Sequence, residues 1–425
     1  MALSIKEKLR FLDRASASNS PKIHLQDKSS TTKPFFPESE ILENEFGSCV
    51  LRKKIYPLTF AHGGITLEKF QEVPQKIFSL LGKDSHLSTL DTKKIIFLDS
   101  ETTGLAGWTG TFIFLLGLGF FEPDAFVIKQ FILLDVSQER AFLHEIKKCL
   151  DDKACFITYN GKSYDIPLLK TRFLIHRIAT TLEHFDHIDL LHHCRRLWKK
   201  SLGICSLTNV ETHLLGFQRQ QDIPGSEIPS IYFNVIRTRN FDELLPIVKH
   251  NVQDILSMVS IIVASHNIIM HGSNPLTADR TWLVRLHASL KNYEAALTVP
   301  ENATETPLQV AQFPLLLEKA RIYKKLQRYE KAIELWTHLQ SQSQLNEECY
   351  TEPAKIYEHK YNDLEKALRT IEKLEKRIEI LQELRPHTCI QLKDNIKKRK
   401  NRLLRKLSRY DKVNDARQRY NSVYG

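Results

Sequence analysis

Short apolar runs alternate with amphipathic stretches over the first two thirds of the chain. The runs are bounded by Gly, Pro and Asp, which favours strands, and the amphipathic stretches repeat their apolar positions at helical spacing. The expected strands are 50–56, 94–98, 111–120, 125–133 and 155–159, and the expected helices are 68–81, 138–149, 166–176, 188–199, 206–214 and 244–265. Strands mixed with helices in this order predict an α/β fold with a mixed sheet flanked by helices.

The last third of the chain has a different pattern. Residues 267–280 combine Gly, Ser, Asn and Pro and predict a linker. Beyond it the pattern is all-helical, and "NYEAAL" at 292–297 recurs as "RYEKAI" at 328–333 and as "DLEKAL" at 363–368, at spacings of 36 and 35 residues. A period near 34 residues is typical of tetratricopeptide-like repeats, so we predict an all-α repeat domain over 280–425. An unrelated helical bundle is the alternative.

The net charge of +11 is concentrated at one end of the chain. Residues 385–425 contain thirteen Lys or Arg and three Asp, and the remainder is close to neutral. Such a basic tail can hold phosphates by displacing their counter-ions, but it can equally be the solvated face of a helix.

The N-terminal region predicts little regular structure. Residues 1–45 are rich in Ser, Thr, Lys and Pro and are expected to be disordered, and 46–90 form a lead-in to the next domain. The first residues lack the apolar core of a secretory signal, and the longest apolar run, 112–121, is too short to span a bilayer. Seven scattered cysteines without a CxxC pair are typical of reduced thiols, which favours a cytoplasmic protein.

Two carboxylates stand where an apolar strand ends, in "KKIIFLDSETTGL". Side chains at i and i+2 of a strand share a face, so Asp99 and Glu101 are expected to project together and Ser100 to project away. Two close carboxylates repel each other unless a cation lies between them, and oxygen ligands suit Mg²⁺ or Mn²⁺. The pair could also be an acidic strand end that faces water.

Two later segments carry further acidic groups. "FITYNGKSYDIPLL" brings Asp165 to a helix start, where an ordinary N-cap is the alternative reading. "VKHNVQDILSMVSII" places His250 and Asp254 four residues apart on one helical face, which could instead be a simple polar stripe. Together the four carboxylates could hold two divalent ions of a phosphoryl-transfer site, and an imidazole could take the proton from the attacking water.

These motifs resemble a known superfamily. "DSETTGL" is similar to the first motif of DnaQ-like, DEDD-type 3′–5′ exonucleases, which have a ribonuclease-H-like fold. More closely, residues 97 to about 265 resemble the YprB-type ribonuclease-H-like domain of bacteria, so we expect a ribonuclease-H-like exonuclease domain over 91–268. The resemblance is carried by "FLDSETTGLAGWTGTFIFLLGLGFF", "FITYNGKSYDIPLL", "IDLLHHCRRLWKKSLGICSLTNVE", "DIPGSEIP" and "HNVQDILSM", with "YPLTFAHGG" similar to the family's lead-in.

The resemblance implies roles for five residues. The acidic quartet falls on Asp99, Glu101, Asp165 and Asp254 as ligands of two Mg²⁺ or Mn²⁺ ions, and His250 becomes the general base. In the superfamily a histidine base usually stands five residues before the last aspartate and a tyrosine base four. This chain has a histidine at the tyrosine's spacing, so activation of water by metal alone, with His250 contacting phosphate, stays open.

Six further residues are candidates for substrate binding. Tyr159 and Asn160 end a strand and could contact substrate or only shape the turn. The cations of "DLLHHCRRLWKK" could hold phosphates and its Trp could stack on a base, whereas a solvated helix face with a core Trp is the alternative. The full set is Thr102, Tyr159, Asn160, Arg195, Arg196 and Trp198.

The sequence therefore predicts a metal-dependent nuclease, a 3′–5′ exonuclease of single-stranded DNA or RNA, with repeats that bind a protein partner. An endonuclease is the alternative within this class. From another class, a non-catalytic nucleic-acid-binding module with a repeat scaffold is the alternative. No motif reads a base or a 2′-hydroxyl, so the sequence does not choose between DNA and RNA.

Overall fold

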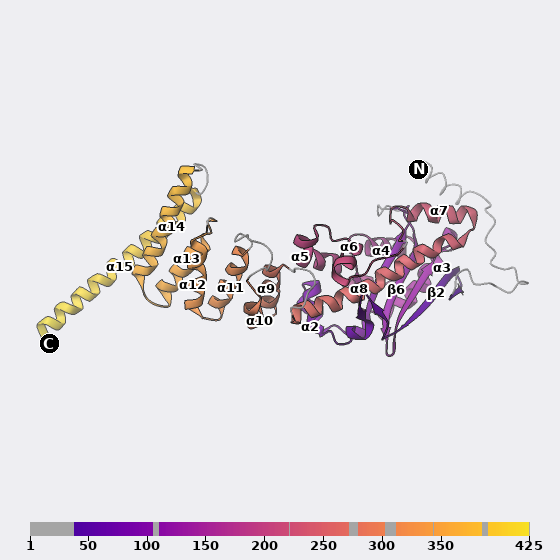
Figure 1. Ribbon diagram of the computed structural model, residues 1–425, viewed down its shortest axis with the longest axis horizontal. Coiled ribbons are helices and arrows are strands. Elements are labelled where there is room, and N and C mark those ends of the chain that lie inside the picture. Colours follow the sequence, from indigo (N-terminus) through magenta and orange to yellow (C-terminus); the bar gives the residue numbers. More distant parts are fainter. Residues whose placement is uncertain are drawn as a thin grey trace, which may run out of the picture. The chain divides into compact units, whose positions relative to one another are not determined.

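The structure is a computed structural model that describes residues 38–104, 110–220, 222–271, 279–301, 312–342, 344–384 and 390–424. The chain divides after Asp279 into an α/β unit and an all-helical unit, which confirms the predicted fold class (Figure 1). The predicted disorder of residues 1–37 and residues 272–278 of the predicted linker lie outside the described residues.

The α/β unit is built on one mixed, seven-stranded sheet. Its strand order is β1-β2-β7-β6-β5-β8-β9. Across the sheet, each of β1, β2, β7, β6 and β5 is antiparallel to the next. β8 runs parallel to β5, and β9 runs parallel to β8. The bounds are β1 (Ser39–Asn44), β2 (Gly47–Pro57), β5 (Ile95–Thr102), β6 (Ile113–Glu122), β7 (Ala125–Ile132), β8 (Cys155–Thr158) and β9 (Asp186–Asp189), with a separate hairpin of β3 (Ala61–His62) and β4 (Ile65–Thr66).

Four strands predicted from the apolar runs, β5 to β8, are confirmed to within a few residues, and the strand predicted at 50–56 is the longer β2. The prediction of disorder is wrong for residues 39–44, because β1 pairs with β2 along its whole length. The predicted helix at 188–199 begins later than expected, since its first residues belong to β9. Four residues are too few for alternation to reveal a strand.

Helices cover both faces of this sheet. α3 (Glu139–Leu150), α4 (Asp165–Ile175) and α7 (Ile228–Thr238) share a core with the face that carries Ile96 and Leu98. The opposite face, which carries Phe97, lies under the long α8 (Leu245–His271) and the turn Leu67–Phe70. The unit also contains α2 (Gln75–Gly82), α5 (Leu190–Leu202), α6 (Leu207–Val210) and a π-helical turn at Glu211–Leu215.

α8 lies directly on the backbone of β6 because glycines leave room for it. A Cβ atom at Gly117 would come within 2.1 Å of Asn251 Oδ1, and one at Gly119 within 2.5 Å of Ile255 Cγ2. By length and composition Phe241–Met270 could cross a membrane, but most of it is buried in the structure. α8 is therefore the central core helix of this unit.

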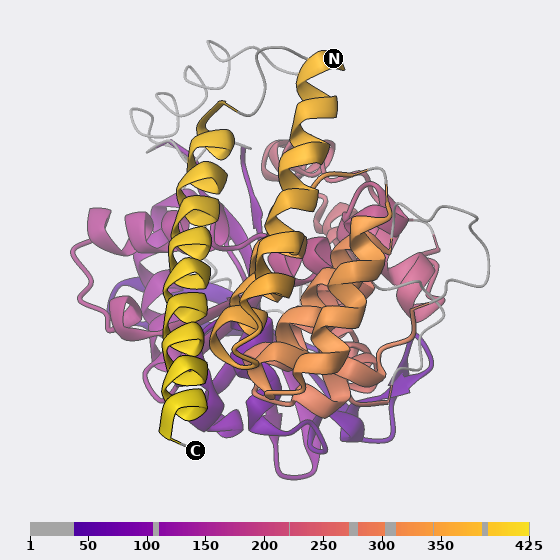
Figure 2. The ribbon, with the colours of Figure 1, turned by 90° about the vertical axis from the view of Figure 1, so that its left-hand side faces the viewer.

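The second unit consists of helices that pack on one another in sequence order (Figure 2). Their bounds are α9 (Arg280–Ser289), α10 (Tyr293–Thr298), α11 (Phe313–Lys325), α12 (Tyr329–Gln340), α13 (Glu348–His359), α14 (Leu364–Leu384) and α15 (Ile390–Tyr424). Left-handed backbone recurs at Lys291, Gln327 and Asn362, in the turns just before the repeated sequence motifs. The same turn thus recurs at spacings of 36 and 35 residues, although assignment to the tetratricopeptide class stays a prediction.

Part of the basic tail packs against this unit. Lys400 pairs with Glu375 on α14, and both Arg402 and Lys406 pair with the buried Glu358 on α13. These three cations are held by the protein itself, which supports a helix-packing role for this part of α15.

Candidate active site

Asp99 and Glu101 lie near the end of β5, where the predicted alternation is observed. Asn251 on α8 contacts Asp99 from the α8 face, whereas the hydroxyl of Ser100, which projects to the other face, donates to Asp165 Oδ1. The pairing with β6 shifts register between Glu101 and Thr102, as in a β-bulge. The strand therefore ends with two carboxylates directed to one side and a serine to the other.

Asp165 is the first residue of α4, which follows β8. The N-cap position that the sequence suggested is occupied by Tyr164, so Asp165 does not cap this helix. Its carboxylate accepts from Ser100 on the neighbouring strand β5. This contact brings a third acidic group to the end of β5 from a different element.

His250 and Asp254 project from one face of α8 toward Glu101. The His250 Nε2 atom lies 3.6 Å from Asp254 Oδ2 and 4.0 Å from Glu101 Oε1. The side chains of Glu101, His250 and Asp254 are 12%, 15% and 14% exposed, so each remains partly accessible to solvent. The imidazole thus directs one ring nitrogen at two carboxylates in a partly open site.

Burial raises the pKa values of all four carboxyl groups, and the charges of other members of the quartet also raise those of Asp99 and Glu101. For Asp99, burial raises the pKa most, followed by the charges of Asp254 and Asp165. Burial and then Asp99 raise the pKa of Glu101, and burial raises that of Asp165 to about 6. Burial also raises the pKa of Asp254, although the charge of Arg219 opposes it. Such a cluster is costly without a compensating cation.

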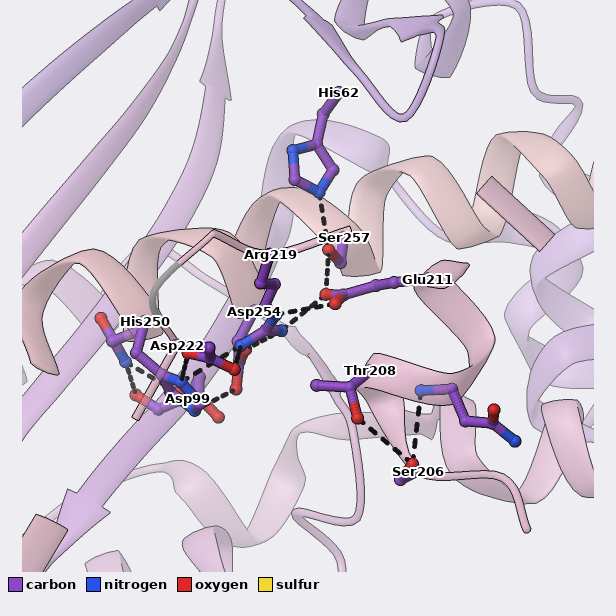
Figure 3. Close-up of polar contacts among 12 residues, drawn as sticks. His62, Asp99, Ser206, Thr208, Glu211, Arg219, Asp222, His250, Asp254 and Ser257 are labelled. Carbon is purple, nitrogen blue, oxygen red and sulfur yellow. Dashed lines mark hydrogen bonds and ion pairs between the residues drawn. The ribbon is translucent and has the colours of Figure 1, made fainter. Parts of the chain in front are cut away.

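Arg219 supplies positive charge at one edge of the cluster (Figure 3). Its guanidinium pairs with Asp254 and donates to Glu211 at 2.6–2.7 Å. Glu211, which is fully buried, also accepts from Ser257, and Ser257 bonds to His62 at 2.7 Å. A continuous polar chain therefore runs from His62 to Asp254 and fixes the guanidinium.

Asp222 orients the imidazole of His250. The Nδ1 atom of His250 lies 2.6 Å from Asp222 Oδ1, on the side of the ring opposite the acidic cluster. When Nδ1 carries a proton and donates it to Asp222, Nε2 is left free to accept one, as in histidines held by a carboxylate. Arg219 Nη1 lies 3.2 Å from the same Nδ1.

A bonded row of side chains crosses the sheet and ends at Asp99. In the strand registers Arg52, Gln130, Gly117 and Asp99 are opposite one another on β2, β7, β6 and β5. Asn251 fills the space above Gly117. It accepts from Gln130 Nε2 at 2.8 Å and donates to Asp99 Oδ2 at 2.8 Å, while Arg52 donates to Gln130 at 2.9 Å. This row holds the Asp99 carboxylate in one orientation.

The structure gives local roles to three of the proposed substrate contacts. Thr102 Oγ1 donates to Gly104 O, and the Tyr159 hydroxyl donates to Cys205 O at 2.7 Å. Asn160 has a left-handed backbone with φ of 70°, and its backbone N–H donates to Asp189 Oδ1. Asp189 also caps α5, so these contacts shape the turns beside the site.

The predicted role of Trp198 is wrong. Its side chain is fully buried and packs edge-on against His193, so no base can stack on it. Arg196 Nη2 donates to the carbonyl of Leu81 and ties α5 to α2. Arg195 is exposed and stays a predicted phosphate contact. The core-Trp alternative was therefore the better reading of this helix.

Sequence reasoning missed five residues around the acidic quartet. Gln130 lies within an apolar strand, and Asn251 lies between His250 and Asp254 in sequence. An amide side chain among apolar neighbours is a signal in the sequence that could have identified either residue. The other three come from the turn and loop at 211–222. Glu211 ends the segment "IDLLHHCRRLWKKSLGICSLTNVE" and Asp222 begins "DIPGSEIP", but neither residue was predicted to belong to the site. The five residues are Gln130, Glu211, Arg219, Asp222 and Asn251.

The donor chemistry of the quartet fits a hard divalent cation, since four carboxylates offer oxygen ligands only. Their raised pKa values indicate that negative charge is under-compensated there. Within the described ranges, however, no group of three or more His, Cys, Asp or Glu side chains is close enough to form a complete ligand set. Arg219 holds Asp254, and Ser100 holds Asp165, so side-chain shifts must accompany ion binding.

Comparison with known proteins identifies the superfamily and the family to which the chain belongs. Residues 96–265 match the model of the RNase_H superfamily. The matched range covers nearly all of β5, all of α4 and most of α8. The chain is also 34% identical over 356 residues to the Bacillus subtilis (strain 168) protein YprB, described as uncharacterized, with 80% of this chain and 82% of YprB covered. The chain therefore belongs to the YprB family, and its first unit contains a ribonuclease-H-like domain.

Proposed function

We propose that the protein is a metal-dependent nuclease that removes nucleotides from the 3′ end of single-stranded DNA or RNA. The observation that carries this proposal is that carboxylates from β5, α4 and α8 lie close enough for their charges to act on one another, and that two of them, Glu101 and Asp254, face His250 Nε2. Membership of the ribonuclease-H superfamily, whose nucleases generally use divalent ions, supports the same chemistry.

In this proposal Asp99, Glu101, Asp165 and Asp254 hold two Mg²⁺ or Mn²⁺ ions. The ions supply charge stabilisation for the attacking and leaving oxygens of a phosphodiester. His250 Nε2 accepts the proton of the attacking water, and Asp222 holds the ring so that Nε2 faces the acidic cluster. Asn251 keeps the Asp99 carboxylate aligned.

Digestion of end-labelled strands tests this function. Matched 5′-labelled DNA and RNA oligonucleotides, with free or blocked 3′ ends, and a circular single strand are incubated with Mg²⁺, Mn²⁺ or EDTA. We expect stepwise shortening of one or both linear polymers, only with metal and only from a free 3′ end. Cutting of the circle would assign an endonuclease instead, and equal decay in EDTA would refute metal dependence.

Asp222→Asn is expected to lower kcat about 10- to 100-fold with little change in KM, because partners that orient a catalytic histidine typically contribute that much. The variant keeps a hydrogen-bond acceptor for Nδ1 but loses the negative charge beside the imidazolium that forms when Nε2 takes the proton of water. His250→Ala should be less active still. Wild-type activity in Asp222→Asn would show that Asp222 does not position the base.

A second candidate function is a non-catalytic nucleic-acid-binding module, and the Arg219–Asp254 ion pair favours it. A fixed guanidinium could replace a metal ion as the permanent counter-charge. Mn²⁺ titration followed by thermal melting separates the two functions, because a nuclease is stabilised by Mn²⁺ and a permanently Arg-neutralised site is not. The helical unit is then proposed to bind a protein partner in either case.

A further inference from the structure

A cavity lies on the α8 face of the sheet, beside β2, whereas the acidic cluster lies near the end of β5. Its volume is about 390 Å³, which is within the range of small-ligand pockets. We call it the β2–α8 groove. Its walls are formed by β2, the β3–β4 hairpin, Phe217 and α8. The lining comprises Arg52, Lys54, Tyr56, Phe60, Ala61, His62, Gly63, Phe217, Leu245, Val248, Lys249, Val252, Gln253 and Leu256.

The charge of the groove is of one sign. Among the described residues, its lining includes three cations, Arg52, Lys54 and Lys249, and no carboxylate. Arg52 is paired with Glu38, but neither Lys54 nor Lys249 forms an ion pair with any residue that the structure describes, and Lys54 Nζ lies 5.2 Å from the centroid of the Tyr56 ring. Burial and then the charge of Arg219 lower the pKa of His62 to about 4, so this histidine is neutral at pH 7 and the two lysines supply the positive charge.

Aromatic and apolar side chains form the rest of the groove. Phe60 and Phe217 are half-buried, whereas Tyr56, Val252 and Leu256 are buried beneath them. Ser260 donates to the carbonyl of His62, and the His62 ring packs on Phe217 at 4.2 Å, so the walls are fixed to α8. Aromatic walls beside unpaired cations are the combination that holds a base and its phosphate.

A cavity on the other face of the sheet provides a contrast. It lies between α3 and the strands and has a volume of about 490 Å³, but three lysines and three carboxylates line it together. Lys148 pairs with Glu145 there, and Lys153 with Asp152. That cavity is larger yet internally neutralised, so volume alone does not distinguish the β2–α8 groove.

The groove and the acidic cluster are close together around α8. Lys249 and Gln253 line the groove, and the residues that follow them, His250 and Asp254, face the cluster. In the strand registers Arg52, which lines the groove, and Asp99 are three strands apart, so at ~4.8 Å per strand the two sites are separated by about 14 Å. A single strand with its 3′ end at the cluster could therefore reach the groove after a few nucleotides.

We propose that the β2–α8 groove binds a nucleotide unit of the substrate strand, a few positions to the 5′ side of the reacting phosphodiester. This inference rests on the proposed nucleic-acid function. Phe60 and Phe217 contact the base, and Lys54 and Lys249 contact the phosphate. The groove would thereby make binding depend on strand length.

The test compares dT12 with dT3, each labelled with 5′-fluorescein, by fluorescence anisotropy in EDTA, where no cleavage occurs. Lys54→Glu/Lys249→Glu should weaken dT12 binding at least about tenfold and lower the salt slope of log K by about two, because two phosphate contacts are lost. Binding of dT3, which is too short to span both sites, should change little. Phe217→Leu should weaken dT12 binding without changing the salt slope.

The matched control is Lys53→Glu/Lys76→Glu, which makes the same charge change at exposed sites outside the groove. Equal weakening of dT12 binding by both double variants would overturn the groove, as would equal weakening of dT3. Competition by dAMP, adenosine and inorganic phosphate then distinguishes a site for free nucleotides from one that needs a strand. Binding is measured in EDTA and does not depend on cleavage. Failure of the groove proposal would therefore appear in these binding data, whereas failure of the nuclease proposal would appear in the digestion of linear strands.

Discussion

Asp99→Asn should lower metal-dependent cleavage by at least about a thousandfold while the protein remains folded. Asp99 is the carboxylate at which the bonded row and the acidic cluster meet. Loss of one anionic ligand removes several kcal/mol of charge stabilisation, and each 1.36 kcal/mol is tenfold in rate. Single-turnover digestion of a linear strand with Mg²⁺ or Mn²⁺ measures the change.

The same substitution should raise thermal stability at neutral pH in the absence of metal. The pKa of Asp99 is higher in the folded protein than in the unfolded chain. At a pH above both pKa values the carboxyl group is ionised in both states, and the folded state bears the cost of that buried charge. The asparagine can still accept the bond from Asn251. The melting temperature of the variant should therefore exceed that of the wild type at pH 8, and the difference should shrink as pH falls toward 4.

Mn²⁺ should reverse that order, since it neutralises the carboxylates of the wild type and binds the variant more weakly. Asp151→Asn, at an exposed aspartate paired with Lys147 on α3, is the matched control and should change neither rate nor metal response. Full activity in Asp99→Asn would refute the catalytic site. A variant that is inactive but less stable at every pH would instead indicate a folding defect.

Arg172→Met should destabilise the α/β unit by about 3–5 kcal/mol, because it removes the guanidinium that pairs with the buried Glu139 and leaves, among the described residues, only His176 Nε2 bonded to that carboxylate. Arg172 and Glu139 are 4% and 2% exposed, and the guanidinium donates to both carboxylate oxygens. Their pairing joins α4 to α3, and α4 begins at Asp165. Urea unfolding followed by circular dichroism measures the loss.

The double variant Glu139→Gln/Arg172→Met separates charge from packing. It also removes the buried negative charge of Glu139, so most of the lost stability should return. Arg172 also stacks on Phe112 at 4.4 Å, and Met retains part of that contact. If the double variant is as unstable as Arg172→Met, the burial of the Glu139 charge without the guanidinium is not the cause. Mn²⁺ binding should weaken in Arg172→Met even where the protein is folded, since α4 positions Asp165.

The hydrophobic pattern was sufficient for the α/β class, for β5 to β8 and for the long helix α8, because each either belongs to a continuous apolar run or is long enough for its periodicity to be visible. It failed at β1 and β9. β1 is a short, polar strand at the edge of the sheet, and its stability comes from pairing with β2 rather than from its own composition. β9 has four residues and is recognisable only beside β8.

The sequence by itself determined which residues are chemically competent: the Asp99 and Glu101 pair on one face of a strand and the His250 and Asp254 pair on one face of a helix. These are local consequences of the strand and helix periods. Only the tertiary structure decided what surrounds them. Asn251 reaches Asp99 because Gly117 leaves space. Arg219 and Asp222 come from a loop and lie 35 and 28 residues before the α8 residues Asp254 and His250 that they contact. Contacts between distant segments depend on how the chain packs, which no local period records.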